Sequence, residues 1–348
     1  MKTFDYSFLK TLLVPSDFLS SISFIYGLQS KSDLLKDKFP DVFTGLRKIA
    51  IVESVKGSNA IEGIVTSDSR IKAIVNGNSA PRNHSEEEIA GYRDALNYIH
   101  ANRDSLSMSE DLIKELHKMV LSHTALPYGG QYKNEDNVIR ERRSDGVTLI
   151  KWVPTSAKET PGTMEQLVGA FLEARDDSGI NQLLLIPSFI LDFLCVHPFR
   201  DGNGRMSRLL TLFLLYKAGF DVPEYISFEE QINKDKGRYY EALKESSIGW
   251  HEGKNDYLPF MGNTIFTLFC CYQELDKRFL TLRDGKVSKT ERIEHAVLTS
   301  LLPISKADIA YLLPDVSVTT IEAVLAKMVK EGKIVKSGST KDARYSKI

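Results

Sequence analysis

The stretch His197–Arg208 reads HPFRDGNGRMSR and separates two apolar runs, residues 183–196 and 209–216. Such runs are typical of buried helices, so the stretch is predicted to form a loop followed by the first turn of the second helix. The first backbone N–H groups of a helix have no internal partner and face outward, and glycines let an anion come close to the backbone. The sequence therefore predicts an anion-binding site at the start of this helix.

The charged side chains of this stretch suit a nucleotide polyphosphate. Arg205 and Arg208 are three positions apart, so they share a helix face and can grip one polyphosphate. Asp201 supplies a hard oxygen ligand for Mg²⁺, and His197 is the one residue here able to accept a proton near neutral pH. Together these residues predict a site for a nucleoside triphosphate, a metal ion and a base.

The stretch resembles the signature of the Fic family, H-x-F-x-[DE]-G-N-G-R-x-x-R, at each defined position. The resemblance implies a mainly α fold, a Fic-type helical bundle with a β-hairpin flap. It also implies transfer of AMP from ATP to Ser, Thr or Tyr hydroxyls of target proteins or of the chain itself, with release of pyrophosphate. His197 would be the catalytic base, Asp201 would hold Mg²⁺, and ATP would be the co-substrate. The implied nucleotide-binding residues of the signature are Gly202, Asn203, Gly204, Arg205, Met206, Ser207 and Arg208, of which the first three form the anion hole.

Three further residues follow the core helix, where members of this family build the nucleoside pocket. Asp235, Tyr239 and Tyr240 are therefore expected to bind the nucleotide. Asp235 stands where the family pattern has Asn, and core packing is an equal alternative for the two tyrosines.

A helix is predicted from Val42 onward, because apolar residues recur there at spacings of three and four. It runs into the segment SNAIEG, in which Ser58 and Glu62 share a face and Gly63 is a suitable helix stop. Alone, this is an ordinary helix end. Beside the signature it resembles the inhibitory motif of the family, [ST]-x-x-x-E-[GN]. The resemblance implies that Glu62 pairs with Arg208 and blocks the γ-phosphate.

Residues 127–161 interrupt the helical pattern. Residues 138–141 and 147–153 are predicted strands, joined by a turn at Ser144-Asp145-Gly146. The family resemblance implies that this hairpin, residues 138–153, is a flap on which a protein target adds itself as a strand; a plain surface loop is the alternative. Basic residues in and beside it favour an acidic partner or form a solvated face. They are Lys133, Arg140, Arg142, Arg143 and Lys151.

The chain is expected to divide into an N-terminal region with the inhibitory helix, residues 1–80, a catalytic core, residues 81–282, and a C-terminal domain, residues 290–348. Residues 1 to about 40 are weakly patterned and predict only short pieces packed on the main body. Ser85 and Glu88 predict a capping box for a helix that ends near residue 102. Several histidines have no partner at zinc-ligand spacing and are interpreted as structural or solvent-facing. They are His100, His117 and His123.

From Thr290 onward, three short helices and a two-strand ribbon resemble a small winged helix-turn-helix domain. Residues 291–348 hold nine Lys and Arg against seven Asp and Glu. Basic charge supplies most non-specific affinity for DNA, and here the excess is slight. An interaction or regulatory module is therefore at least as well supported as a DNA reader.

The totals exclude several classes of protein. The chain has 348 residues, 42% of them hydrophobic, and a net charge of −1, so no global field favours nucleic acid. Three cysteines give neither a disulfide framework nor a metal motif. No signal peptide is seen at the start, and no apolar run reaches the roughly 18 residues of a membrane span. A cytoplasmic location without a membrane partner is expected.

Other functions stay open at this point. A Fic-fold deAMPylase, or another nucleotidyl or phosphoryl transferase, would use the same residues, with Glu62 placing a hydrolytic water. A nucleotide-sensing transcriptional regulator would act through the C-terminal domain, but a pure sensor has no need of His197. Members of the family often dimerise, so a homodimer is a further candidate assembly.

Overall fold

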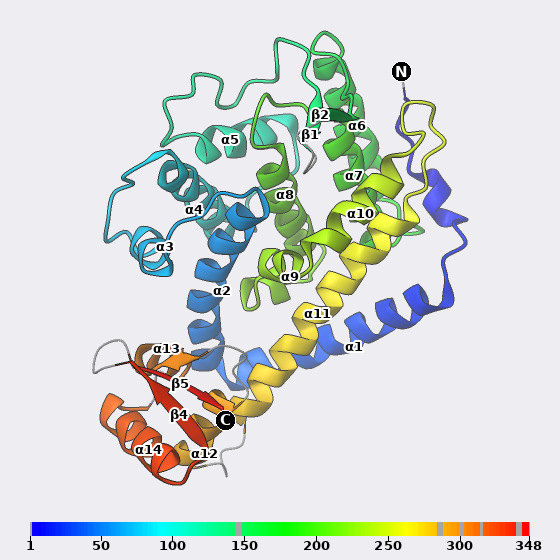
Figure 1. The fold of residues 1–348 in the computed structure, drawn as a ribbon. Helices are drawn as coiled ribbons and strands as arrows, with labels where there is room; N and C mark the ends of the chain where they lie inside the picture. Colours follow the sequence, from blue (N-terminus) through cyan, green and yellow to red (C-terminus); the bar gives the residue numbers. More distant parts are fainter. Residues whose placement is uncertain are drawn as a thin grey trace.

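The computed structural model describes residues 2–142, 148–283, 288–298, 303–313, 316–338 and 343–347. The described chain is mainly helical, as expected (Figure 1). Its α-helices are α1 Ser16–Lys38, α2 Pro40–Ile61, α3 Asp68–Val75, α4 His84–Asn102, α5 Glu110–Val120, α6 Thr160–Arg175, α7 Gln182–Val196, α8 Asn203–Lys217, α9 Phe228–Lys234, α10 Lys236–Ser247, α11 Leu258–Arg283, α12 Lys289–Leu298, α13 Lys306–Leu312 and α14 Val318–Lys330. Two 3₁₀ helices are η1 Ser7–Lys10 and η2 Val222–Glu224.

Helices α7 and α8 form the centre of the main body. Every residue of α7 from Leu183 to Val196 is buried, because the run is apolar except for Ser188 and Asp192 and neighbouring helices surround it. Helix α8 is buried nearly throughout, and α4, α5, α6, α10 and α11 lie around the pair (Figure 1). The polar stretch between α7 and α8 therefore has a rigid, fully packed helix on each side.

Helix α2 packs along α9 and α4 and ends beside the start of α8. Its last turn is closed by hydrogen bonds from Ile64 N to Asn59 O at 2.9 Å and from Gly63 N to Ala60 O at 3.1 Å. This pair of bonds, with Gly63 at φ +79°, is the Schellman arrangement in which glycine supplies the left-handed residue. The stop predicted at Gly63 is thus confirmed, and it fixes where Glu62 lies.

The predicted hairpin is confirmed. Strands β1 Ile139–Arg142 and β2 Thr148–Trp152 pair antiparallel, with Arg140 opposite Ile150 and an irregularity after Ile139. The turn predicted at residues 144–146 lies outside the described residues.

The C-terminal part has its own small sheet and its own apolar core. Strands β3 Ile304–Ser305, β4 Ile334–Ser337 and β5 Arg344–Lys347 form an antiparallel sheet in the order β3-β5-β4. A cluster of buried side chains running from Ile293 to Tyr345 joins this sheet to α12, α13 and α14. Helix α13 contacts α2, and Lys72 of α3 pairs with Asp308 at 3.2 Å.

Helices α1 and α3 are among the elements that the sequence did not predict. Helix α1 replaces the short pieces expected before residue 40, and α3 follows the α2 stop. In α1, the apolar side chains Leu19, Phe24 and Leu34 are exposed, so its apolar positions do not mark one buried face. No described helix has the length and apolar character needed to cross a bilayer.

Candidate functional site

The polar stretch forms the expected loop and helix start. Helix α7 ends at Val196, and His197 has φ 53° and ψ 60°, in the left-handed region. Gly202 precedes α8 with φ 78°, a conformation that glycine adopts without strain. The two ends of the loop are therefore both left-handed, which turns the chain from one buried helix directly into the next.

The side chain of Asn203 closes this loop on itself. Its Oδ1 accepts a hydrogen bond from Phe199 N at 2.9 Å, and its Nδ2 donates to Phe199 O at 2.8 Å. Both side chains are buried. The amide of Asn203 is therefore committed to the loop, and only its backbone N–H remains for the predicted anion hole.

His117 of α5 supports the loop from beneath. Its ring stacks on Phe199, with centroids 3.7 Å apart and planes 16° apart. Nδ1 accepts from Gly130 N at 3.0 Å, so Nε2 carries the proton and donates to Asp201 O at 3.1 Å. Burial lowers the pKa of His117 to about 4, which keeps the ring neutral. The structural interpretation of His117 is thus confirmed and the solvent-facing alternative is wrong.

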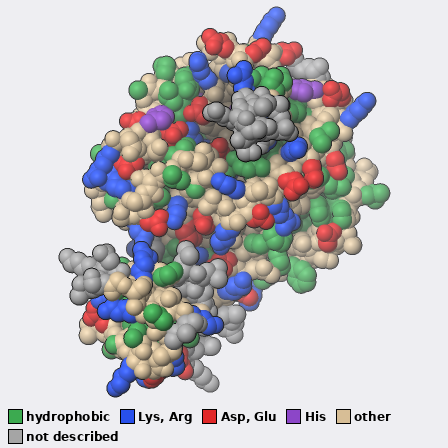
Figure 2. All heavy atoms as spheres, viewed as in Figure 1, with side chains coloured by type: hydrophobic (Ala, Val, Ile, Leu, Met, Phe, Trp, Pro, Cys, Tyr) green, Lys and Arg blue, Asp and Glu red, His purple; other side chains and the backbone are tan. Residues whose placement is uncertain are grey.

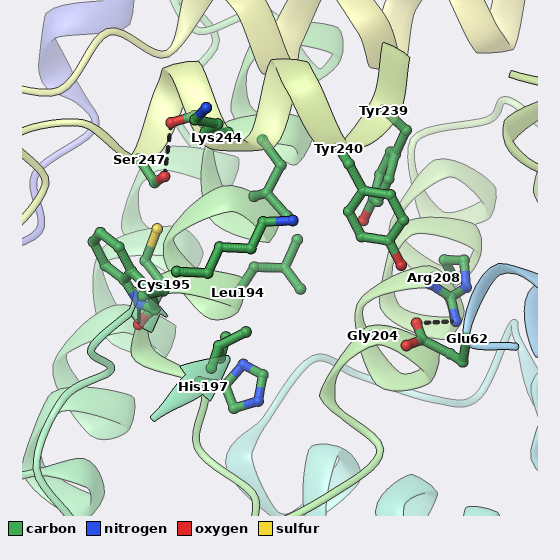
Figure 3. Close-up of a pocket in the computed structure, with 14 residues that line it drawn as sticks. Glu62, Leu194, Cys195, His197, Gly204, Arg208, Tyr239, Tyr240, Lys244 and Ser247 are labelled. Carbon is green, nitrogen blue, oxygen red and sulfur yellow. Dashed lines mark hydrogen bonds and ion pairs between the residues drawn. The ribbon is translucent and has the colours of Figure 1, made fainter. Parts of the chain in front are cut away.

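Arg208 is buried and fully engaged by the end of α2. Its Nε donates to Ser58 Oγ at 2.8 Å, and one terminal nitrogen donates to Ser58 O at 3.0 Å and to Glu62 Oε1 at 2.9 Å. The expected Glu62–Arg208 pair is thus present (Figure 3). It joins residues 146 positions apart in the chain.

Arg205 is held by Glu88, for which the sequence predicts only a role in a helix cap. A terminal nitrogen of Arg205 lies 2.9 Å from Glu88 Oε1 and 3.5 Å from Asp201 Oδ2. The other terminal nitrogen is buried and has no hydrogen-bond partner among the described residues. The predicted capping box with Ser85 is wrong: α4 begins at His84, and Asn83 caps it by accepting from Glu86 N at 3.0 Å. One turn further along, Glu88 faces α8 instead.

Gly204 lies directly under the Glu62 carboxylate. A Cβ placed there would be 2.1 Å from Glu62 Oε1 and 3.4 Å from a terminal nitrogen of Arg208. Only hydrogen at this position leaves room for an anionic oxygen against the start of α8. The carboxylate thus takes space that a phosphate group would need.

Two adjoining hollows surround His197. One, of about 230 Å³, has mostly apolar walls, and the other, of about 330 Å³, is polar. His197, Glu62 and Gly204 line both. Figure 3 shows His197 on one side of the first hollow and the Glu62–Arg208 pair on another. The first is also lined by Ile139, Lys151, Trp152, Leu194, Cys195, Arg208, Tyr239, Tyr240, Leu243, Lys244 and Ser247, and the second by Ile64, Glu88, Arg200, Asp201, Gly202, Asn203 and Arg205.

The imidazole of His197 is held in its neutral form. Burial lowers the pKa of its imidazole to about 4, and the Lys133 ammonium acts in the same direction. Glu62 and Asp201 oppose this shift. The ring is therefore neutral at pH 7, as a general base must be before the reaction.

Some of the expected nucleotide ligands lie elsewhere. Asp235 is exposed and caps α10 by accepting from Arg238 N at 3.3 Å. Met206 is buried in the hydrophobic core, and Ser207 donates its hydroxyl to Gly204 O at 2.8 Å. None of these three lines either hollow, whereas Tyr239 and Tyr240 do.

The basic cluster expected beside the hairpin does not form as one surface. Lys133 is 5% exposed, so it is unavailable to an acidic partner. Lys151 lies over the ring of Tyr240 at 5.3 Å, and Arg140 is exposed. Arg143 lies outside the described residues. On the face seen in Figure 2, Lys and Arg side chains are mixed with Asp and Glu.

Asp201 is the residue best placed to hold a cation beside the polar hollow. Its carboxylate is 46% exposed, and Oδ1 accepts from Gly202 N at 2.6 Å. Among the described residues, no group of three or more His, Cys, Asp or Glu side chains could enclose a metal ion. The arrangement fits Mg²⁺, which keeps waters and takes one or two carboxylates together with substrate phosphates.

Comparison with known sequences identifies a domain in this chain. Residues 107–215 match the profile of the Fic/DOC family. The protein adenylyltransferase Fic of Nematostella vectensis is 31% identical over 222 residues, which cover 62% of this chain and 46% of that protein. The protein adenylyltransferase Fic of Drosophila persimilis is 28% identical over 261 residues, covering 72% and 46%. The chain thus spans about half the length of the curated relatives that it matches.

Solved structures share the fold. A Fic family protein from Desulfovibrio desulfuricans G20 superimposes with a TM-score of 0.62 at 17% identity, covering 97% of each chain. A Fic domain containing signaling protein from Bacteroides thetaiotaomicron gives a TM-score of 0.60 at 22% identity, covering 73% of this chain and 95% of that one. The mainly helical Fic fold is therefore confirmed.

Proposed function

We propose that this chain, in which residues 107–215 match the Fic/DOC profile, belongs to that family and is an Mg²⁺-dependent protein adenylyltransferase. It would transfer AMP from ATP to Ser, Thr or Tyr hydroxyls of target proteins or of itself. The observation that carries the proposal is the position of His197. A neutral imidazole lies where an apolar hollow and a polar, arginine-lined hollow meet. A nucleotide would place its nucleoside in the first hollow and its phosphates over Gly204, where the two hollows meet, between Arg208 of the first and Arg205 of the second. The α-phosphorus would lie near His197.

The reaction would proceed by direct displacement at that phosphorus. His197 takes the proton of the target hydroxyl as its oxygen attacks the α-phosphorus, while the bond to the bridging oxygen breaks and pyrophosphate leaves. Arg205 and Arg208 bind the phosphates, and the first N–H groups of α8 face the developing negative charge. A buried guanidinium with one nitrogen still unpartnered, as in Arg205, supports this role.

Asp201 would hold Mg²⁺ beside these phosphates. When bound, the ion supplies positive charge that neutralises the pyrophosphate leaving group. The Asp201 carbonyl is fixed by His117, so the backbone that carries the carboxylate is held in place.

We also propose that Glu62 inhibits the transfer. The carboxylate occupies Arg208 and the space over Gly204, both of which the outer phosphate of ATP needs. Charge-assisted bonds of this kind are strong when desolvated, so ATP must displace Glu62 to bind productively. ATP bound without displacing it would have its α-phosphorus misplaced.

The hairpin would present the target. Three of the residues that line the apolar hollow belong to this hairpin: Ile139 of β1, and Lys151 and Trp152 of β2. A target segment that pairs with a free strand edge would therefore carry its hydroxyl toward His197. Such pairing reads backbone more than side chain, so it fits targets of varied sequence.

The test compares the wild type with Glu62→Gly and Glu62→Gln, using ATP labelled at the α-phosphate. Glu62→Gly is expected to raise incorporation of label into the protein at least tenfold, because Arg208 is released. Glu62→Gln, which keeps the shape but loses the charge, should give an intermediate rise. Adding His197→Ala to Glu62→Gly should lower the rate by at least about 100-fold.

Mass spectrometry of the modified protein separates this function from its alternatives. A gain of AMP supports the proposal, whereas a gain of phosphate, or loss of AMP from a modified target, would indicate another transferase or a deAMPylase. Labelling that persists without His197 removes it as the base. Equal labelling by all Glu62 variants would contradict the inhibition.

The C-terminal part is proposed to be a winged helix-like interaction module. Helices α13 and α14 with the β4–β5 ribbon support this arrangement. On α14 the exposed charges include Glu322 as well as Lys327 and Lys330, so the face is not uniformly basic. Specific, salt-sensitive binding of a duplex would instead favour the DNA-regulator alternative.

A further inference from the structure

One residue contacts three successive carbonyls of the loop that begins with His197. The ammonium of Lys133 donates to Val196 O at 3.2 Å and to His197 O at 3.0 Å, and its third N–H goes to Asn137 Oδ1 at 3.1 Å. The backbone N of Lys133 donates to Pro198 O at 2.9 Å. Lys133 thus clamps the chain on both sides of the imidazole.

The clamped backbone is the strained part of the loop. Among the described residues, His197 is the one non-glycine residue with a positive φ, a conformation that brings Cβ too close to the neighbouring carbonyl oxygen. His197 directly follows the end of α7. The last carbonyls of a helix have no helical partners, and they lie at the negative end of the helix dipole. An ammonium group at this point satisfies those oxygens and is attracted to the dipole.

Lys133 is well suited to a fixed internal role. It is 5% exposed, and all three ammonium N–H groups go to neutral oxygens. Burial lowers the pKa of its ammonium to about 8, so the group is still mostly protonated at pH 7. A charge buried in this way is retained only where its hydrogen bonds are complete.

Lys133 also lies close to the hairpin in the sequence. It precedes β1, Ile139–Arg142, by six positions, and Trp152 of β2 donates its Nε1 to Cys195 O at 2.9 Å. The carbonyl oxygens of residues 195 to 198 therefore all accept hydrogen bonds from two residues, Lys133 before the hairpin and Trp152 at its end. The β1–β2 hairpin and the loop that carries His197 therefore form one connected unit.

We propose that Lys133 is a positioning residue for the transfer reaction: by capping α7 it holds His197 in the left-handed conformation that directs the imidazole into the cleft. This inference rests on the proposed role of His197 as the base. Lys133 lines neither hollow, so it should affect the geometry of the base and leave nucleotide binding unchanged.

The experiment replaces Lys133 in the Glu62→Gly background. Lys133→Met keeps the length and removes every side-chain donor, and Lys133→Arg restores donors and charge. Lys158→Met is the matched control, because Lys158 is exposed on the same segment. We expect Lys133→Met to lower kcat for labelling at least tenfold with KM for ATP changed less than twofold. Lys133→Arg should recover part of kcat, and Lys158→Met should match its parent.

A second measurement does not depend on catalysis. Hydrogen–deuterium exchange of the backbone amides of residues 194–204 should be faster in Lys133→Met, largely restored in Lys133→Arg and unchanged in Lys158→Met. If Lys133→Met does not fold, Lys133→Gln, which keeps one donor group, carries both measurements.

The outcomes separate this inference from the proposed function. If the Glu62→Gly parent transfers no AMP, the proposed function fails, while the exchange data still decide whether Lys133 holds the loop. Unchanged kcat together with unchanged exchange would overturn the inference. A fall in kcat matched by an equal rise in KM for ATP would also overturn it, because that pattern indicates a nucleotide ligand.

Discussion

His117 shows how a single residue without a reactive role can set the site. Its two ring nitrogens bond to Gly130 and Asp201, and its face stacks on Phe199. The contacts with Asp201 and Phe199 hold the loop between α7 and α8, and the bond from Gly130 orients the ring. The geometry of the polar hollow therefore depends on a side chain that never reaches it.

The replacement His117→Phe tests this support. Phenylalanine keeps the stacked ring but leaves the carbonyl of Asp201 and the N–H of Gly130 without their partner. Each unsatisfied buried group costs about 1–3 kcal/mol, so the loss of two partners should lower the free energy of unfolding by about 2–6 kcal/mol. Urea denaturation measures the change, and His123→Phe, at a partly exposed histidine, is the control. A loss below about 0.5 kcal/mol would show that the two hydrogen bonds contribute little.

At the scale of elements, the position of α2 decides whether Glu62 can reach Arg208. Helix α2 lies against α9 at Gly57, where a Cβ would be 2.8 Å from Glu230 N and 3.0 Å from its Cα. Both atoms are backbone, so they cannot yield as a side chain would. The close approach of the two helices therefore requires glycine at this position.

We expect Gly57→Ala to force α2 away from α9. The added methyl group would overpack the contact, which destabilises by about 1–3 kcal/mol. Alanine has a higher helix propensity than glycine, which stabilises by up to about 1 kcal/mol. The free energy of unfolding should therefore fall. Labelling should rise, since the displaced helix carries Glu62. In contrast, Gly169→Ala on α6 meets no atom within 4 Å and should stabilise by about 0.5–1 kcal/mol. Thermal unfolding of both variants is the measurement, and equal stabilisation by both would refute the close approach.

At the scale of the whole molecule, buried histidines predict acid sensitivity. Burial lowers the pKa of His100, His117 and His197 to about 4 each. Between about pH 6.5 and pH 4 these residues take up protons in the unfolded chain but not in the folded one. The free energy of unfolding should therefore fall as the pH falls through this window, by up to about 1.4 kcal/mol per pH unit for each histidine.

His100 gives the cleanest test, because its Nε2 lies 3.0 Å from the hydroxyl of Tyr216, away from the cleft. Between pH 6.5 and 4, His100→Gln should reduce the slope of the free energy of unfolding against pH. The reduction should be up to about 1.4 kcal/mol per pH unit, which corresponds to one proton. His84→Gln, at a histidine whose side chain is 60% exposed, is the matched control. Chemical denaturation at half-unit pH steps measures the slope, and identical slopes in all three proteins would disprove the assignment.

The site was predictable to the extent that its parts are close in sequence. The loop between α7 and α8, the pair of arginines and the stop at Gly63 follow from local spacing, which is why the sequence located them. Glu88 and Lys133 were misinterpreted, as a cap and as a surface charge. Each has an ordinary local explanation, and its true partner lies on another helix or loop.

Local patterns along the chain were enough to predict the two buried helices, the polar turn between them and the family that this turn resembles, because apolar periodicity, glycine and charge act within a few residues. The side chains that support that turn became visible in the folded chain alone. Lys133 meets His197 across 64 positions and His117 meets Asp201 across 84. The physical reason is that hydrogen bonds and burial depend on distance in space, and packing of distant helices sets that distance.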